Sequence, residues 1–261
     1  MKRTLINADI NNYPPELRSL LEGARIYDSS CSPEARVIFV DKGEGYYLKS
    51  APKDTLSMEA QMTGYFHKKG LGTEVVDYIS TDRDWLLTRK ASGEDCTHKS
   101  YLDEPERLCD LLAAELYRLH HTDFADCPVP NRIDGYLKTA RDNYHSGKGD
   151  LSLFSGAWGF ESIREAWEIV DKYGHLLKND CLIHGDFCLP NIMLDNWHLS
   201  AFIDLGNGGV GDKHIDIFWA VWSLFFNLKT DKYTHRFLDA YGRGELNTDM
   251  LKVVAAAEVF G

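Results

Sequence analysis

The sequence predicts an α+β protein with a β-rich first lobe and a mostly helical second lobe. Short β-prone runs gather in the first part of the chain, and amphipathic helical patterns fill most of the second part. The pattern changes after the small polar stretch at 91–93, which indicates a hinge near 89–93. We therefore predict an N-terminal lobe over residues 1–92 and a C-terminal lobe over residues 93–261.

In the first lobe, four runs rich in β-branched and aromatic residues predict strands. These runs are 35–40, 45–49, 75–79 and 85–88. The intervening segment 41–44 contains a glycine and is typical of a hairpin turn. Residues 54–69 repeat apolar positions at helical spacing, so they predict a helix that ends at Lys69 and Gly70.

In the second lobe, the strongest helical pattern lies at 105–121, where leucines recur every three or four positions from Leu108 to Leu119. Further helices are predicted at 161–177, 218–228 and 250–260. Between them, short apolar runs around 181–183, 192–194 and 201–203 predict three strands. Two polar loops follow the first and the last of these strands.

Composition limits the possible partners. The six cysteines form no CxxC pair, so neither a disulfide framework nor a zinc site is indicated. No run approaches the ~18 apolar residues of a membrane span, and the first residues lack the apolar stretch of a secretion signal. A formal net charge of -11 disfavours nucleic acid and favours cationic ligands, although it can also serve solubility alone. We expect a cytoplasmic protein without a membrane partner, as a monomer or weak dimer.

The loops of the second lobe carry polar residues of the kind used in phosphoryl transfer. Asp186 follows an apolar run, Asn191 comes five positions later, and Asp204 comes thirteen positions after that. Transfer from ATP needs one carboxylate that orients the attacking hydroxyl, and it needs an amide and a second carboxylate that hold Mg²⁺ against the phosphates. The spacing therefore indicates an ATP- and Mg²⁺-dependent kinase.

Each of these residues also has an ordinary structural explanation. A loop aspartate can accept backbone hydrogen bonds, an asparagine after proline can belong to a turn, and an aspartate near glycine can stabilise one. The combination at this spacing favours Asp186 as catalytic base, with Asn191 and Asp204 as metal ligands. His184 is expected to orient the loop backbone rather than to transfer protons.

The first lobe offers residues for nucleotide binding. Lys49 ends an apolar strand and can contact the α- and β-phosphates, and Glu59 on the following helix can hold it in place. In isolation, both would be read as ordinary surface charges. The residues of the later loops favour the functional reading, in which the Lys49 amine and the Asp204 carboxylate share one site.

The remaining nucleotide contacts are less specific, because the chain has no GxGxxG loop. Ser30 and Ser32 lie in the polar segment 29–33 and can offer hydroxyls and backbone N–H groups to phosphate, although a plain polar turn is the alternative. In the predicted hinge, Arg89 and Ala91 can present backbone groups to adenine.

Together these motifs resemble the aminoglycoside phosphotransferase family of the protein-kinase-like fold, and specifically the aminoglycoside 3′-phosphotransferases. The motifs of the second half are the most specific, and the resemblance extends over almost the full length. The residues that carry it are His184-Gly185-Asp186, Leu189-Pro190-Asn191-Ile192-Met193, Phe202-Ile203-Asp204-Leu205-Gly206, Gly209-Val210-Gly211-Asp212-Lys213, Asp216-Ile217, Cys31-Ser32-Pro33, Lys49, Glu59, Trp85-Leu86-Leu87 and Leu119-His120.

The resemblance implies a bilobal protein-kinase-like fold, ATP and Mg²⁺ as cofactors, and phosphorylation of an aminoglycoside antibiotic, with antibiotic resistance as a consequence. It implies that Asp186 is the catalytic base and that Asp216 supports the catalytic loop from the next helix. A polycationic acceptor agrees with the acidic composition. Glu258 and the carboxylate of Gly261 are candidate anchors for its ammonium groups.

The chain also departs from the family pattern. Asn207 and Trp222 stand where the family usually has arginines, and the final five residues keep one acid, Glu258. Each carboxylate lost from a cation-binding pocket removes a charge-assisted hydrogen bond worth roughly 1.5–3 kcal/mol. Other acceptors therefore stay open: a macrolide, choline, a sugar or another metabolite. An aromatic stripe over 218–226 would suit an apolar or cation–π pocket, although such stripes more often form helix core. A nucleotide-binding pseudokinase is the remaining alternative.

Overall fold

The computed structural model describes the chain except for residues 1–2, 32–34, 153 and 155–156. The chain divides into two compact units. The first contains the residues up to Cys96 together with Pro190–Gly206, and the second contains Thr97–Leu189 and Asn207–Gly261. The first unit thus takes in a segment that the sequence had assigned to the second lobe. The division into lobes at residues 92 and 93 stays a prediction.

A six-stranded antiparallel sheet forms the first unit, with the strand order β1-β2-β3-β4-β6-β5. The strands are β1 (Thr4–Ile6), β2 (Arg25–Asp28), β3 (Arg36–Asp41), β4 (Tyr46–Pro52), β5 (Val75–Ser80) and β6 (Arg83–Arg89). The four predicted strands are confirmed as β3 to β6. The turn predicted at 41–44 joins β3 to β4, and Gly43 and Gly45 within and after it have positive φ angles of 62° and 92°.

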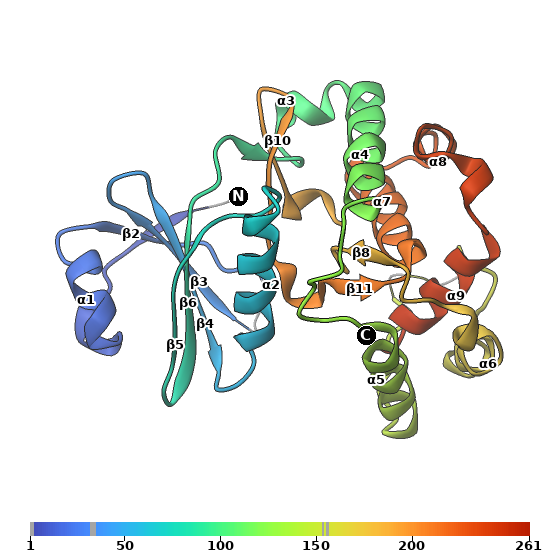
Figure 1. The fold of residues 1–261 in the computed structure, drawn as a ribbon, viewed down its shortest axis with the longest axis horizontal. Helices are drawn as coiled ribbons and strands as arrows, with labels where there is room; N and C mark the ends of the chain where they lie inside the picture. Colours follow the sequence, from blue (N-terminus) through green and yellow to red (C-terminus); the bar gives the residue numbers. More distant parts are fainter. Residues whose placement is uncertain (1–2, 32–34, 153, 155–156) are drawn as a thin grey trace. The chain divides into compact units, whose positions relative to one another are not determined.

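The two faces of this sheet differ because side chains alternate along each strand. On one face, Ile38 of β3 and Leu48 of β4 share a buried apolar cluster with Leu17 and Leu21 of helix α1 (Pro15–Leu21). Figure 1 shows this helix beside the sheet. Lys49 is the residue after Leu48, so its side chain lies on the opposite face. The burial of one face therefore fixes which face carries the lysine.

Helix α2 (Ser57–Lys68) confirms the helix predicted at 54–69. It buries Met62 and Phe66, and its first turn carries Glu59. The loop before it is fixed because the Leu56 backbone N–H donates to the buried Asp84 carboxylate of β6 at 2.9 Å. This contact sets the position at which α2 leaves the sheet.

A smaller sheet, β10-β9-β7, completes the first unit. Its strands are β7 (Glu94–Asp95), β9 (Ile192–Asp195) and β10 (His198–Phe202). The pairing of β7 with β9 brings residues 190–206 into this unit. Gly93 has a φ of 78°, and a Cβ there would lie 1.9 Å from the Leu194 carbonyl oxygen, so this approach requires glycine.

The second unit is mostly helical. Its helices are α3 (Lys99–Leu102), α4 (Pro105–His120), α5 (Ile133–His145), α6 (Ile163–Tyr173), α7 (Lys213–Leu228), α8 (Thr234–Tyr241) and α9 (Asp249–Glu258). Strands β8 (Cys181–Ile183) and β11 (Gly209–Gly211) pair with each other in antiparallel register. Short 3₁₀ turns in the chain lie at Ile10–Asn12, Gly174–Leu176, Leu189–Asn191, Leu205–Asn207 and Arg243–Glu245.

Most predicted helices of this unit are confirmed, as α4, α6 and α9. The helix predicted at 218–228 is the later part of α7, which already begins at Lys213. Its true start is set by Asp212, whose side chain accepts a hydrogen bond from the His214 backbone N–H at 2.9 Å. In the part of the chain that the structure describes, no helix is both long enough and apolar enough to cross a membrane.

Candidate active site

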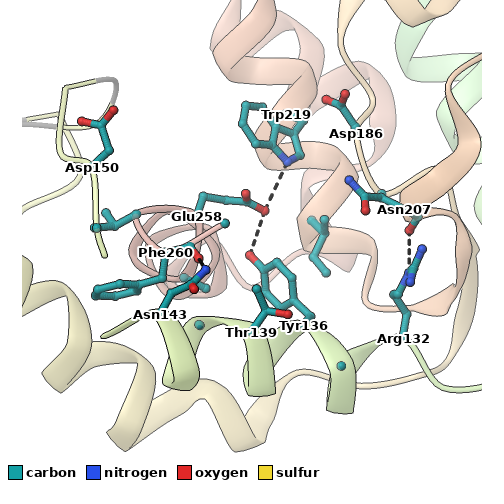
Figure 2. Close-up of a pocket in the computed structure, with 18 of the residues that line it drawn as sticks. Arg132, Tyr136, Thr139, Asn143, Asp150, Asp186, Asn207, Trp219, Glu258 and Phe260 are labelled. Carbon is teal, nitrogen blue, oxygen red and sulfur yellow. Dashed lines mark hydrogen bonds between the residues drawn. The ribbon is translucent and has the colours of Figure 1, made fainter. Parts of the chain in front are cut away.

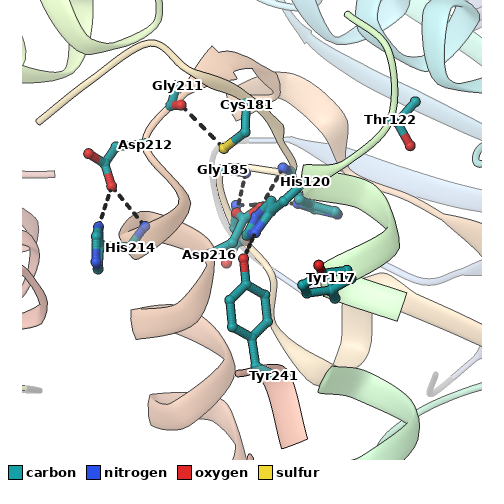
Figure 3. Close-up of polar contacts among 12 residues, drawn as sticks. Tyr117, His120, Thr122, Cys181, Gly185, Gly211, Asp212, His214, Asp216 and Tyr241 are labelled. Carbon is teal, nitrogen blue, oxygen red and sulfur yellow. Dashed lines mark hydrogen bonds and ion pairs between the residues drawn. The ribbon is translucent and has the colours of Figure 1, made fainter. Parts of the chain in front are cut away.

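One buried carboxylate holds the loop after β8 by hydrogen bonds to its backbone. Asp216, in the first turn of α7, accepts hydrogen bonds from the backbone N–H groups of His184 at 2.8 Å and Gly185 at 2.7 Å. His120 of α4 adds a third contact through Nε2 at 3.2 Å, visible in Figure 3. Asp216 is completely buried, so these three donors replace the water that its charge has lost. The support of the loop that the family resemblance implied is present.

Within the loop, the chain turns so that Asp186 is partly exposed while its neighbours are buried. The Asp186 backbone N–H donates to His184 Nδ1 at 3.2 Å, which agrees with the predicted role of His184 in orienting the backbone. Gly185 has a φ of 83°, and a Cβ there would lie 2.1 Å from the Asn207 carbonyl oxygen. Only glycine allows this turn, and the turn directs the Asp186 side chain into a cavity.

Three charged residues from distant parts of the sequence meet in the first unit. Lys49 Nζ lies 2.7 Å from Glu59 Oε2 and 2.8 Å from Asp204 Oδ1. The predicted Lys49–Glu59 ion pair is therefore present, and the Lys49 amine and Asp204 carboxylate are in direct contact. Burial alone would lower the pKa of Lys49, but the attraction of the two carboxylates outweighs it and raises that pKa. The amine is held charged in a fixed position.

The oxygen donors beside this cluster fit a magnesium ion. The Ile203 backbone N–H donates to the Asn191 carbonyl oxygen at 3.0 Å. Because Asp204 follows Ile203, this bond brings the backbone of Asp204 near that of Asn191. Asp204 has a φ of 59°, an unfavourable conformation for a non-glycine residue. No cluster of three or more His, Cys, Asp or Glu side chains suited to a metal occurs among the described residues. Mg²⁺ nevertheless fits, because it binds through one or two protein oxygens, water and substrate phosphates.

A cavity of about 780 Å³ opens beside Asp186 in the second unit (Figure 2). Helix α5 supplies Tyr136, α7 supplies Trp219, and the end of α9 supplies Glu258 to its walls. Among the residues that the structure describes, three carboxylate side chains line it, from Asp150, Asp186 and Glu258. Two cationic side chains, from Arg132 and Lys148, also line it. Its size suits a ligand of several rings.

Glu258 is held in the cavity by two hydrogen bonds. Its Oε1 accepts hydrogen bonds from the Tyr136 hydroxyl at 2.9 Å and from Trp219 Nε1 at 3.2 Å. Burial raises the pKa of Glu258 to about 7, the two donors oppose that rise, and the nearby Asp186 charge adds to it. Gly261, the second residue predicted to bind substrate, also lines the cavity.

The other predicted nucleotide contacts lie in the first unit. The Ser30 hydroxyl accepts from the Val37 backbone N–H at 3.0 Å, so it stabilises its own loop. Ser32 lies outside the described residues. The Arg89 side chain pairs with Glu74. Ala91 lies in the loop between β6 and β7, and its backbone makes no hydrogen bond with any residue that the structure describes.

The sequence did not single out Arg132 or Tyr136 for the cavity. Arg132 immediately precedes α5 and Tyr136 lies in its first turn, and no helix had been predicted there. The aromatic stripe of α7 divides between two roles: Phe218 is buried in the core, whereas Trp219 lines the cavity. Further along α7, Trp222 continues the row of rings, with its centroid 5.5 Å from that of Trp219.

An antiparallel sheet unit followed by a helical unit, with a lysine–glutamate pair on the sheet and a supported aspartate loop, defines a protein of the kinase-like class. Residues 33–252 match the family described as "Phosphotransferase enzyme family". The chain therefore belongs to the phosphotransferase enzyme family.

Two curated relatives span nearly the whole chain. The "Probable aminoglycoside 3'-phosphotransferase" of Lactococcus lactis subsp. lactis (strain IL1403) is 48% identical over 257 residues, which is 98% of each protein. The "Aminoglycoside 3'-phosphotransferase" of Niallia circulans is 28% identical over 271 residues, covering 98% of this chain and all of the relative.

Solved structures share the fold. An aminoglycoside-3'-phosphotransferase of type VIII superimposes with a TM-score of 0.75 over 96% of each chain, at 20% sequence identity. An aminoglycoside phosphotransferase of Streptomyces rimosus, in complex with ADP and streptomycin, superimposes with a TM-score of 0.70 over 87% of this chain and 91% of its own, at 19% identity. At this level of identity, the likeness establishes the kinase-like fold.

Proposed function

We propose that this chain transfers the γ-phosphoryl group of ATP to a hydroxyl of an aminoglycoside antibiotic, as an aminoglycoside 3′-phosphotransferase. The observation that carries the proposal is the Lys49 ammonium, held at once by Glu59 at 2.7 Å and Asp204 at 2.8 Å. A lysine fixed in this way is the phosphate-binding device of kinases. The relative from Lactococcus lactis, with its 48% identity, supports the choice of acceptor.

In this proposal, the first unit binds the nucleotide. The Lys49 ammonium contacts the α- and β-phosphates, and Glu59 prevents it from turning away. The free backbone groups of Ala91 are available to the adenine base. Asn191 and Asp204 would hold Mg²⁺, which when bound neutralises charge on the phosphate oxygens.

The second unit binds and orients the acceptor. Asp186 accepts a hydrogen bond from the reacting hydroxyl and directs its oxygen toward the γ-phosphorus. It takes the hydroxyl proton as the new P–O bond forms, while the bond from the γ-phosphorus to the oxygen shared with the β-phosphate breaks and ADP leaves. The loop amides are held by hydrogen bonds to Asp216, in a turn that requires glycine at position 185. This preorganisation lowers the barrier, since no loop ordering is needed during the reaction.

The cavity beside Asp186 provides the chemistry for a polycation. Glu258 and Asp150 would bind ammonium groups, while Tyr136 and Trp219 would contact the faces of the rings. Glu258 is prepared for this role, because its two neutral hydrogen-bond donors fix its position without neutralising its charge.

The aromatic residues of α7 favour a second acceptor class as an alternative. Trp219 lies in the cavity wall, Trp222 packs against it, and Phe226 stacks on Trp222 with a centroid distance of 5.0 Å. Phe226 is 48% exposed. A row of aromatic rings that begins in the cavity wall suits a larger apolar alcohol, such as a macrolide, better than it suits a highly hydrated polycation.

The test is a substrate panel. Purified protein with MgATP is incubated with kanamycin-type aminoglycosides, a macrolide, choline and simple sugars, and products are identified by mass and ³¹P NMR. The proposal expects a monophosphorylated aminoglycoside carrying the phosphate at the 3′ position. Phosphorylation of another alcohol with no transfer to any aminoglycoside would contradict the proposed acceptor class. If thermal shift showed that the protein binds MgATP but no compound were phosphorylated, the proposed kinase activity would be wrong.

A further inference from the structure

A chain of buried hydrogen bonds runs from helix α8 to the loop that carries Asp186 (Figure 3). It begins at the Tyr241 hydroxyl, which lies 2.7 Å from His120 Nδ1. His120 Nε2 lies 3.2 Å from Asp216 Oδ2, the same oxygen that accepts the His184 backbone N–H at 2.8 Å. Tyr241, His120 and Asp216 are each at most 6% exposed. Water therefore cannot substitute for any of these contacts.

The available donors and acceptors determine which group donates at each of these hydrogen bonds. Within the described part of the molecule, His120 Nδ1 is the acceptor available to the buried Tyr241 hydroxyl. A buried O–H group without an acceptor costs free energy, so Tyr241 donates and His120 Nδ1 accepts. In a neutral imidazole the proton then resides on Nε2, where it is donated to Asp216. Tyr241 thus selects the His120 tautomer that supports the loop.

The consequences of the wrong tautomer are specific. With the proton on Nδ1, the Nε2 lone pair would face the Asp216 carboxylate, which is a repulsive contact in a buried site. Asp216 also holds the amides of His184 and Gly185, so a shift of its carboxylate moves the backbone next to Asp186. The Asp186 position relative to a bound hydroxyl depends on this backbone.

We propose that Tyr241 is a positioning residue, which acts through His120 and Asp216 to hold the Asp186 loop in its reactive conformation. This inference rests on the proposed role of Asp186. It adds a residue of α8 that does not line the cavity and that no sequence motif had indicated. Because Tyr241 contacts neither nucleotide nor acceptor in this arrangement, its loss is expected to affect kcat and to leave both KM values unchanged.

The experiment is a double-mutant cycle with Tyr241→Phe and His120→Gln. Tyr241→Phe keeps the ring and removes the hydroxyl. We expect kcat to fall roughly tenfold, with KM for ATP and for the aminoglycoside within twofold of wild type. In His120→Gln, the amide N–H can replace the Nε2 donor to Asp216, and no Nδ1 acceptor is left for Tyr241. Adding Tyr241→Phe to His120→Gln should therefore cause no further loss.

Tyr117→Phe is the matched control. Tyr117 packs edge-on against Tyr241, with ring centroids 5.7 Å apart, and no hydrogen bond between described residues uses its hydroxyl. Its variant should retain wild-type kcat. A Tyr241→Phe kcat within twofold of wild type, or losses that multiply in the double variant, would overturn the proposal.

A readout independent of activity separates this inference from the proposed function. Native-state hydrogen exchange at the amides of His184 and Gly185 should accelerate in Tyr241→Phe and not in Tyr117→Phe. If the wild-type protein phosphorylated no alcohol, this exchange difference would still support the hydrogen-bond chain, and only the proposed function would fail. Unchanged exchange at both amides would overturn the positioning role.

Discussion

Glu258 has two properties that decide its behaviour: it lies in the cavity wall, and burial raises its pKa to about 7. A carboxyl in this state changes charge within the ordinary working range of an enzyme. Its two neutral donors, Tyr136 and Trp219, hold the side chain in place in both charge states. In the proposed binding of an ammonium group, the charge of Glu258 would therefore change with pH while its position stays fixed.

Acceptor binding should follow the ionisation of Glu258. Below pH 7 the side chain is mostly neutral, and above pH 7 it is mostly charged, so the KM for an aminoglycoside should fall as the pH is raised from 6 to 8. In Glu258→Gln this part of the pH dependence should disappear, since the amide does not ionise. Steady-state kinetics at several pH values would check it, and a KM trend that persists in Glu258→Gln would assign the ionisation elsewhere.

The same group affects stability independently of any substrate. A carboxyl whose pKa rises from 4.5 to about 7 on folding retains its proton in the native state where the unfolded chain has lost it. Stability therefore decreases as the pH rises between those two values, and the loss is complete above pH 7. Glu258→Gln should remove this loss and stabilise the protein at pH 8 by about 1–3 kcal/mol relative to its effect at pH 4.5. Urea unfolding at both pH values measures the difference; an equal effect of the substitution at both would contradict the assigned pKa.

Sequence reasoning found the polar residues of the motifs but not their full surroundings. Lys49, Glu59 and Asp204 were predictable because each occupies a motif position, and the structure brings the three together. Arg132 and Tyr136 were not, because a cavity wall is defined by packing in three dimensions and leaves no periodic signal in the chain. The roles of all five residues in catalysis and binding stay proposals.

At the scale of elements, the loop after β8 depends on one glycine. Gly185 combines a φ of 83° with a Cβ position 2.1 Å from the Asn207 carbonyl oxygen. Gly147, also in the second unit, has a similar φ of 69° but no atom within 4 Å of its Cβ position. The two glycines thus share the backbone requirement and differ in the steric one.

Gly185→Ala should therefore be much more harmful than Gly147→Ala. We expect Gly147→Ala to cost about 1 kcal/mol through backbone strain alone, and Gly185→Ala to cost about 3 kcal/mol or more because the backbone must also move. Thermal and urea unfolding of both variants, with kinetics of the folded fraction, would measure this. Equal destabilisation of the two would show that the contact with Asn207 is relaxed at little cost.

The success of the element predictions followed the strength of local patterns. α4 was predictable at both ends because leucines repeat along it and a proline begins it. α5 buries only Ile133 and Ala140 along its length, so few apolar residues mark it in the sequence and no helix was predicted. The start of α7 was missed because the capping role of Asp212 depends on its hydrogen bond to the His214 backbone, and the apolar run begins later. The pairing of β7 with β9 joins residues distant in sequence, which local patterns do not reveal.

At the scale of the whole molecule, the formal net charge of -11 is the dominant electrostatic feature. A negative protein attracts a polycationic acceptor over distances that depend on the ionic strength. Raising the salt concentration from 20 to 300 mM should lower kcat/KM for an aminoglycoside by roughly tenfold, and should change KM for ATP much less. A neutral acceptor alcohol is the control, because its kcat/KM should not vary with salt. Equal salt dependence for charged and neutral acceptors would show that the net charge of the protein does not attract the acceptor.

The central claim is that Asp186 serves the chemical step of phosphoryl transfer while the first unit binds the nucleotide. The most direct test is transfer of labelled γ-phosphate from ATP to kanamycin in a single turnover by Asp186→Ala, at protein concentrations where titration shows ATP still bound. We predict unchanged ATP affinity and transfer slowed by about 10²-fold or more. Transfer by Asp186→Ala at the wild-type rate would contradict it.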